Sequence, residues 1–189
     1  MHSSFHLSAL CRVVLCSFVV TLFCTAISGW LGIPDNAKAV RNFELERYLG
    51  TWYEIARLDH PFERGLSQVR AEYIRRDDGG VSVINSGYNQ KEGEWETAKG
   101  KAYFVDSPDI GRLKVSFFGP FYGAYNVVAL DEELYSYSMV ISSNRSYLWI
   151  LARQPTLDSI TVAELVERAS ELGFNTDELI YPEHNAPKN

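Results

Sequence analysis

The side chains that could do chemistry in this chain are few, and Glu54 is the first of them. It lies in the alternating segment Trp52-Tyr-Glu-Ile-Ala56, and a carboxyl group that such a strand turns into a shielded interior can act as a general acid or base. His60 follows in a loop beside Asp59, a setting typical of a solvated histidine rather than a base or a haem ligand. Because the sequence offers Glu54 no identifiable partner base, we interpret it as a hydrogen-bonded structural carboxylate.

Known catalytic and metal-binding motifs are absent from the sequence. It contains no Gly-x-Ser-x-Gly elbow, no phosphate-binding glycine loop and no His-Glu-x-x-His pair. All three cysteines, Cys11, Cys16 and Cys24, lie near the N-terminus, so the rest of the chain has no thiol for a disulfide, a metal or a nucleophile. We therefore expect no cofactor, no metal and no enzyme. The alternatives to a binding protein are a barrel enzyme that acts on a lipid or isoprenoid through Glu54 or an interior tyrosine, and an envelope scaffold that binds no ligand.

The elements that must position these side chains are strands. Aromatic residues make up 13% of the 189 residues, with 11 Tyr and 10 Phe, and they favour β-structure. Turn signals recur at short intervals between alternating segments, which predicts an all-β, eight-stranded, up-and-down antiparallel barrel. The predicted strands cover residues 52–58, 68–76, 81–88, 94–105, 112–118, 124–131, 135–142 and 146–153. The net charge of −6 argues against a nucleic-acid partner and favours small or lipid-like ones.

One helix is expected after the last strand. Thr161-Val-Ala-Glu164 matches a capping box, and Gly173 is placed to end the helix. The helix carries one apolar stripe, made of Leu165, Val166, Ala169 and Leu172. Both faces of residues 147–152 are apolar, so something must cover the outer face of the eighth strand. We therefore predict that the helix packs on the outside of the barrel.

Three residues indicate which end of the barrel is closed. Gly50-Thr51-Trp52 puts a tryptophan at the start of the first strand, and Arg153 ends the eighth. Because successive strands alternate in direction, Trp52 and Arg153 reach the same end, where a cation–π contact is worth about 0.5 to 2 kcal/mol. We predict that Gly50, Trp52 and Arg153 are structural residues of this closed floor. The mouth is then formed by residues 59–67, 89–93, 119–123 and 143–145.

Alternation along the strands selects the side chains that would line the interior. Small residues among them leave room that a packed core would fill, which favours a ligand cavity. The predicted ligand-binding residues are Glu54, Ala56, Leu58, Val69, Ala71, Tyr73, Leu113, Val115, Phe117, Tyr135, Tyr137 and Met139, with Ile141 on the same face.

Aromatic and basic residues gather at the predicted mouth. Phe62 lies in one loop, and the segment 117–123 across the mouth adds Phe118 and Phe121 to the rim. Basic side chains near the rim could meet a carboxylate or phosphate headgroup, and these are Arg57, Arg64, Lys91 and Lys114. The rim aromatics either contact a ligand or a membrane, or they only cap the barrel or form a dimer contact.

The N-terminal part of the chain predicts export. The segment from Val13 to Ile33 contains no formal charge and is long enough, at about 20 residues, to span a bilayer. Three interpretations stay open: a signal cleaved after Ser28, a lipoprotein signal with Cys24 lipidated, or an uncleaved anchor. A lipobox has a small residue before its cysteine, whereas this chain has Phe23. We divide the chain into an export signal or anchor (1–28), a polar tether (29–42), a barrel with its helix (43–182) and a tail (183–189).

Three short regions occur in the order and spacing of a known family. They are Gly50-Thr51-Trp52, Tyr125-Asn-Val-Val-Ala-Leu-Asp131, and Arg153 after Leu148-Trp-Ile-Leu-Ala152. With the longer stretches 48–57 and 113–123, they resemble the lipocalin family, its bacterial members above all, over nearly all of residues 42–182. The resemblance implies a carrier of fatty acids or lysophospholipids on the periplasmic face of the outer membrane, attached as a lipoprotein, that helps to maintain the cell envelope. It also implies a homodimer as one assembly.

Overall fold

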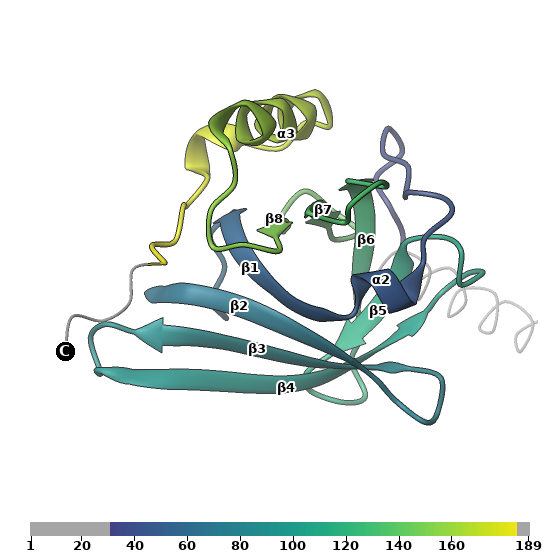
Figure 1. Ribbon diagram of the computed structural model, residues 1–189, viewed down its shortest axis with the longest axis horizontal. Coiled ribbons are helices and arrows are strands. Elements are labelled where there is room, and N and C mark those ends of the chain that lie inside the picture. The colour runs from purple at the N-terminus through teal and green to yellow at the C-terminus, as the bar shows by residue number, and fades with distance from the viewer. Residues whose placement is uncertain (1–30, 185–189) are drawn as a thin grey trace, which may run out of the picture. The chain divides into compact units, whose positions relative to one another are not determined.

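The computed structural model describes residues 31–184, which form a closed barrel of eight antiparallel strands in sequence order (Figure 1). The strands are β1 (Gly50–Arg57), β2 (Leu66–Arg75), β3 (Val81–Asn89), β4 (Glu94–Phe104), β5 (Arg112–Ser116), β6 (Gly123–Leu130), β7 (Tyr137–Ile141) and β8 (Leu148–Ala152). The barrel closes where β1 pairs with β8. The predicted fold class and strand order are therefore confirmed.

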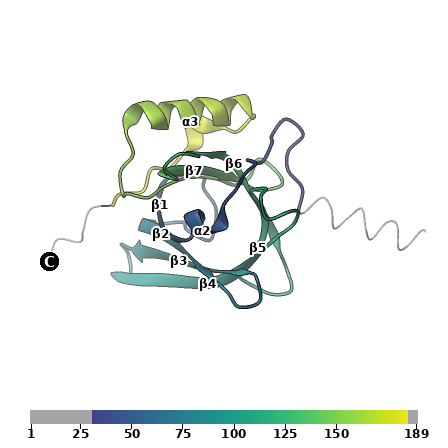
Figure 2. The same cartoon turned by 45° about the vertical axis from the view of Figure 1, so that its right-hand side comes forward.

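A short helix covers one end of the barrel. α2 (Leu45–Tyr48) lies across this end, as the view in Figure 2 shows, and its Leu45 and Tyr48 side chains are buried. Trp52 is fully buried and donates from Nε1 to the Tyr48 carbonyl at 2.8 Å. The Arg153 guanidinium carbon lies 4.0 Å from the centre of the Trp52 ring, so the contact expected between these two residues is present.

Arg153 also joins three separate segments at this floor. Its Nη1 donates to the Thr51 carbonyl at 3.0 Å, its Nη2 to the Arg47 carbonyl at 2.5 Å and its Nε to the Tyr135 carbonyl at 3.3 Å. Gly50 has a φ of +92°, a conformation that glycine adopts without strain, and a Cβ there would lie 3.5 Å from Arg153 Nη1. The floor is thus held by hydrogen bonds as well as by ring contacts.

The segment before α2 packs on the barrel. Val40 donates to the Val127 carbonyl at 2.9 Å and accepts from the Gly111 amide at 3.0 Å, and the Phe43 amide donates to the Asp109 carbonyl at 2.9 Å. Ala37 is buried as well. The described part of the stretch interpreted as a polar tether is therefore bonded to the barrel, because its apolar residues find partners there.

α3 (Ser159–Glu171) packs on the outside of the barrel, over the side that contains β8 (Figure 1). The predicted capping box at Thr161 is wrong, because the Asp158 carboxylate accepts from the Thr161 amide at 2.9 Å and caps the helix three residues earlier. The helix ends before Gly173, whose φ is +84°, as predicted. Beneath α3 lies an apolar group that we call the outer core, and it contains Ala56, Leu58, Met139, Ile141, Leu148, Ile150, Leu165 and Ala169 among others.

The end of the chain completes the barrel wall. β1 pairs with β2 from Gly50 to Tyr53, and residues 180–184, which we call the C-terminal segment, follow a short 3₁₀ helix, η1 (Thr176–Glu178). Arg57 and Ile180 exchange two main-chain hydrogen bonds of 2.9 and 2.8 Å, and the Gln68 amide donates to the Glu183 carbonyl at 2.7 Å. The C-terminal segment is thus bonded to β1 on one side and to β2 on the other.

Candidate functional site

The interior of the barrel is lined by a second apolar group, the inner core, which is separate from the outer core. Predicted ligand-binding residues that pack in the inner core are Ala71, Tyr73, Leu113, Val115, Phe117 and Tyr135. Val69 is buried on the same face of β2 as Ala71, and Glu54 pairs with Leu151 of the inner core. The structure therefore brings these eight predicted residues to the lumen.

An extra residue in β1 reverses the facing that alternation predicts. Glu54 and Ala56, two positions apart, pair with adjacent residues of β8, so Ile55 is inserted as a β-bulge. Ala56 consequently lies in the outer core, and so does Leu58. The predictions that Ala56 and Leu58 line the lumen are wrong for this reason.

A second irregularity precedes β7. Tyr135 has a φ of +54°, and its ring packs in the inner core at the floor. After this turn the alternation no longer continues from Tyr135, so Met139 and Ile141 lie in the outer core and Tyr137 packs against it. The predictions that Tyr137, Met139 and Ile141 face the lumen are wrong.

The lumen is open to solvent in its mouth half. Residues 94–99 of β4 are exposed on both faces of the strand, and they pair with β3 alone because the pairing with β5 begins at Lys101, so the inner face of the wall is open to solvent here. Ala98, Gly100 and Ala102 follow the lumen face toward the floor, paired at its lower part with valines of the inner core. Along these three residues the burial changes from exposed through half-buried to buried. A space that is open at one end and closed by side chains at the other has the geometry of a ligand cavity.

A layer of hydroxyl groups lies deeper in the lumen. Tyr125 OH is 2.7 Å from Tyr73 OH and 2.8 Å from Tyr48 OH, and Tyr48 OH is 3.2 Å from Ser138 Oγ. Burial raises the pKa of Tyr48 to about 12 and the pKa values of Tyr73 and Tyr125 well above 10.0, so these phenols stay neutral. The cavity beside this layer measures about 10 Å³, which is room for about one water molecule.

Four ionisable side chains are buried below the loop that follows β1, and we call them the buried ionic cluster: Glu54, Arg57, His60 and Glu63. Arg57 Nη1 donates to Glu54 Oε1 at 2.5 Å, and Nη2 donates to the Glu63 carbonyl at 2.9 Å. Glu63 Oε2 lies 3.0 Å from His60 Nε2 and accepts from Trp149 Nε1 at 3.1 Å. The loop is thereby anchored inside the barrel through its polar side chains.

This cluster corrects two expectations. Arg57 was expected near the rim and His60 in solvent, but each is only 2% exposed. The bulge turns Arg57 inward, and the loop folds His60 against the rings of Tyr147 and Trp149, at centroid distances of 5.5 and 5.2 Å. Glu63 is absent from the predicted site residues. A carboxylate three positions after His60 can be recognised as its partner only once the loop is known to fold inward.

The two carboxyl groups of the cluster differ in protonation. Burial, and then repulsion by Glu63, raises the pKa of Glu54 well above its ordinary value of 4.5. Burial would also raise the pKa of Glu63, but hydrogen bonds from His60 and Trp149 outweigh it and lower that pKa. Of the two carboxyl groups, Glu54 therefore keeps its proton to the higher pH and Glu63 releases its proton first.

The rim at the mouth is apolar and exposed. Phe62 on one loop, and Phe118 and Phe121 on another, have 67%, 71% and 70% of their surface exposed. Protruding aromatic groups of this kind mark a contact surface for a ligand, a membrane or another protein. Arg64 is exposed beside them and forms an ion pair with Asp59, with Nη2 and Oδ2 2.5 Å apart.

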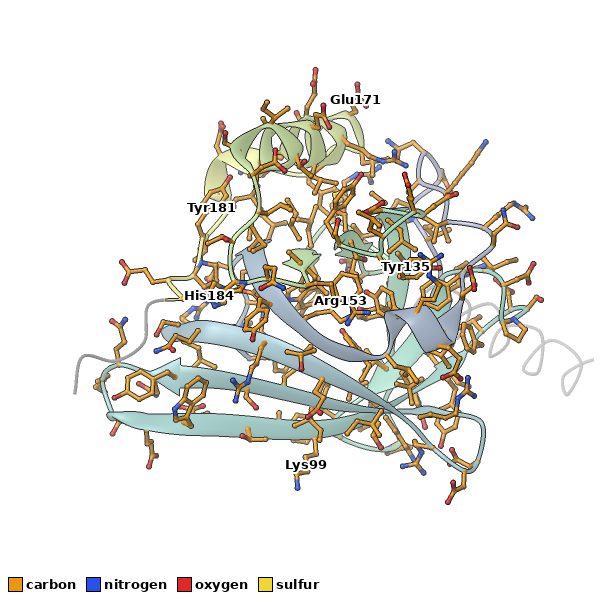
Figure 3. All side chains as sticks on the ribbon, viewed as in Figure 1. Lys99, Tyr135, Arg153, Glu171, Tyr181 and His184 are labelled. Atoms are coloured by element: carbon orange, nitrogen blue, oxygen red, sulfur yellow. The ribbon has the colours of Figure 1, made fainter. Side chains whose placement is uncertain are left out.

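A second concave surface lies outside the barrel. It is a groove of about 530 Å³ between Ile55, the start of α3 and the C-terminal segment, where Tyr181 and His184 line it (Figure 3). The C-terminal segment, which is bonded to both β1 and β2, separates this groove from the lumen. The lumen, where side chains from all around the barrel converge, is therefore a separate space from this groove.

The described residues, 31–184, contain neither a candidate metal site nor a membrane-spanning helix. In this range no group of three or more His, Cys, Asp and Glu side chains could hold a metal ion. No helix among the same residues is long and apolar enough to cross a membrane. The predicted export signal or anchor (1–28) and the candidate lipidation site, Cys24, lie outside the described residues.

Comparison with known sequences gives a consistent result. A family model described as a lipocalin-like domain matches residues 43–184. The chain is 53% identical over 169 residues to outer membrane lipoprotein Blc of Vibrio cholerae, covering 89% of this chain and 95% of that protein. It is 53% identical to outer membrane lipoprotein Blc of Escherichia coli K12 (78% and 83% covered) and 34% identical to temperature-induced lipocalin-1 of Arabidopsis thaliana (80% and 82% covered).

Comparison with solved structures supports the same fold. Insecticyanin from the tobacco hornworm, Manduca sexta, superposes with a TM-score of 0.65 over 82% of this chain and 87% of that one, at 23% identity. The cockroach allergen Per a 4 gives a TM-score of 0.62 over 80% and 94% of the two chains, at 19% identity. At such identities these likenesses show the eight-stranded barrel and its outer helix alone.

Proposed function

This chain belongs to the lipocalin family, and we propose that it binds, stores or transports fatty acids or lysophospholipids in the barrel lumen. The observation that carries the proposal is the lumen itself, which solvent enters at the mouth and which apolar side chains close toward the floor. Lipocalins are generally binding proteins without catalytic activity, in keeping with this role. Cell-envelope maintenance is the proposed purpose, since relatives of 53% identity are named outer membrane lipoproteins.

One acyl chain supplies enough binding free energy for this role. About 12 methylene groups at about 0.8 kcal/mol each contribute about 10 kcal/mol. Association and ordering costs reduce this sum, and a dissociation constant of about 1 μM corresponds to about 8 kcal/mol. Single-chain lipids are therefore ligands of a suitable size.

The test uses two tryptophan substitutions on β4. Ala98→Trp places a bulky ring on the lumen face near the mouth, whereas Lys99→Trp is its control, because Lys99 points away from the barrel (Figure 3). Native mass spectrometry of protein purified without detergent measures the binding of lysophosphatidylcholine and of a fatty acid. Ala98→Trp should weaken binding at least about tenfold and Lys99→Trp should leave it unchanged. If wild type binds neither lipid, or if both variants bind equally well, the lumen is not the ligand site.

A lipid-modifying enzyme is the second candidate, and the buried ionic cluster is the observation that favours it. A carboxyl group with a raised pKa, Glu54, beside one with a lowered pKa, Glu63, is the pairing that acid–base catalysis uses. Against this, Arg57, His60 and Trp149 already bond to the pair, which suits a structural role. Mass analysis of the lipid after incubation separates the two: a chemically altered lipid that disappears with Glu54→Gln supports the enzyme.

We also propose an outer-membrane location with Cys24 as the lipid-anchored residue. The support is the exported character of residues 1–28 and the printed names of the relatives. Labelling cells with radioactive palmitate should mark the wild type and spare Cys24→Ser. Equal labelling of both would exclude Cys24, and the mass of the mature N-terminus then distinguishes cleavage after Ser28 from an uncleaved anchor.

The apolar rim is the proposed contact with the membrane surface. Its three phenylalanines surround the opening through which a lipid would pass. Sedimentation with phospholipid vesicles should fall when Phe118 and Phe121 are replaced by serine. If sedimentation is unchanged while analytical ultracentrifugation shows that a dimer has been lost, the rim is a homodimer contact instead.

A further inference from the structure

The hydrogen bond between Tyr73 and Tyr125 crosses the barrel. Tyr73 belongs to β2 and Tyr125 to β6, and these strands are opposite one another in a closed ring of eight strands in sequence order. Their ring centres are 6.0 Å apart and their hydroxyl oxygens 2.7 Å apart. The two side chains therefore form a bar across the lumen rather than part of one wall.

The bar is supported from the floor. Tyr48 belongs to α2, and its hydroxyl oxygen lies 2.8 Å from the hydroxyl oxygen of Tyr125. The Tyr48 ring also packs against the Tyr73 ring at a centroid distance of 5.5 Å. Among the floor residues that surround the bar, the cavity amounts to about 10 Å³. Phe43 and Leu45, which come from the segment that closes the barrel, form its far wall. An acyl chain that meets the bar thus finds no space beyond it.

We propose that the bar of Tyr73 and Tyr125 is the lower stop of the lumen and sets the longest acyl chain that the protein accepts. This inference rests on the proposed function of lipid binding and adds the residues that limit the length of the bound acyl chain. It assigns a specificity role to two tyrosines whose hydroxyl groups otherwise bond only to one another and to Tyr48.

The position of the bar gives a length that can be tested. β2 runs from Leu66 at the mouth to Tyr73 with one bulge between Ser67 and Arg70, so it advances by the length of its partner segment, Val83 to Asn89 of β3. Strands that advance about 3.3 Å per residue at a tilt of about 40° then leave about 15 Å of depth. Carbon–carbon bonds of about 1.5 Å in an extended zigzag advance about 1.25 Å each. The lumen above the bar therefore holds a chain of about 12 carbon atoms.

The experiment is a chain-length profile with saturated lysophosphatidylcholines. Acyl chains shorter and longer than about 12 carbons are titrated into wild type and Tyr125→Ala, and binding is followed by native mass spectrometry. Wild-type affinity should rise about fourfold per added methylene and then level off at the stop. In Tyr125→Ala the plateau should move to chains longer by about two to four carbons, which should bind about tenfold more tightly than to wild type.

Three further variants make the result decisive. Tyr125→Leu shortens the bar with an apolar side chain and replaces the alanine variant if that one does not fold. Tyr125→Phe keeps the ring and should retain the wild-type plateau, because the stop is steric. Tyr122→Ala is the matched control, since Tyr122 packs against Lys114 and Tyr103 on the outer face of the barrel.

The outcomes separate this inference from the proposed function. A folded Tyr125→Ala or Tyr125→Leu with the wild-type plateau overturns the stop, and so does a Tyr125→Phe that shifts the plateau as far as alanine. A wild type that binds none of these lipids, and no fatty acid, contradicts the proposed function itself.

Discussion

Replacing Glu54 by glutamine should stabilise the protein at neutral and alkaline pH. Glu54 is 2% exposed, accepts from Arg57 Nη1 at 2.5 Å and shares a hydrogen bond with Glu63. A glutamine amide can reproduce both contacts, because its oxygen accepts from Arg57 and its NH₂ group donates to Glu63. The variant therefore changes little besides removing an ionisable group from the cluster.

The sign and size of the effect follow from the raised pKa of Glu54. The unfolded chain releases this proton near pH 4.5, whereas the folded chain holds it to a much higher pH. Between the two pKa values wild-type stability falls as the pH rises, by about 1.4 kcal/mol per pH unit. The advantage of Glu54→Gln should grow at that rate and stop growing above the folded-state pKa. Each kcal/mol raises the Tm by about 2 to 4 °C in a chain of this size.

Unfolding by urea at about pH 4, about pH 6 and about pH 8 measures this difference. Near pH 4 the variant and the wild type should be similarly stable, because Glu54 is then protonated in both states of the wild type. Glu72→Gln, at an exposed position of β2, is the matched control and should follow the wild-type slope. If Glu54→Gln also follows the wild-type slope, or is less stable than wild type near pH 8, the proton does not reside on Glu54.

Three other substitutions or deletions test the supports of the site. Glu63→Ala should lose about 1 to 3 kcal/mol in urea unfolding, because it leaves the Trp149 indole N–H without its acceptor while Arg57 keeps its ion pair with Glu54; no measurable loss would mean that the Glu63 carboxylate does not support the loop. Deletion from Ile180 onward removes the hydrogen bonds to β1 and β2, at about 0.5 to 1.5 kcal/mol each, and hydrogen exchange at the Arg57 and Gln68 amides should rise. Unchanged exchange there would show that the C-terminal segment does not complete the wall. Asp158→Ala should lower the free energy of unfolding by about 1 kcal/mol and Asp158→Asn by less, whereas equal losses would argue against capping.

The barrel and its closed end could be predicted from the sequence, because the strand signals are local and the closed end follows from the number of strands. Alternation and turn residues mark each strand within its own segment, and an even number of strands returns Arg153 to the end where Trp52 begins. The outer helix was also predictable, because both faces of β8 are apolar and only one can face the lumen. None of these inferences depends on the exact register between strands.

The lining of the lumen was harder to predict, because facing depends on every residue between two positions. One inserted residue sends all following side chains to the opposite face. This happens at Ile55, and the turn at Tyr135 has the same consequence for Tyr137 and Met139. Segments without such irregularities, such as the part of β2 that contains Ala71 and Tyr73, follow the alternation.

The β-bulge at Ile55, which interrupts the alternation, also brings the side chains of the buried ionic cluster together. In a regular strand, Glu54 and Arg57 are three positions apart and would point to opposite faces. With Ile55 inserted, both face the lumen and their side chains meet at 2.5 Å, while Ile55 and Ala56 together extend the apolar surface under α3. The outer core thus gains an apolar residue through the same insertion that places a cation beside Glu54. A glutamate and an arginine three positions apart in a predicted strand, with small or apolar residues between them, are therefore the sequence signal from which the bulge could have been inferred.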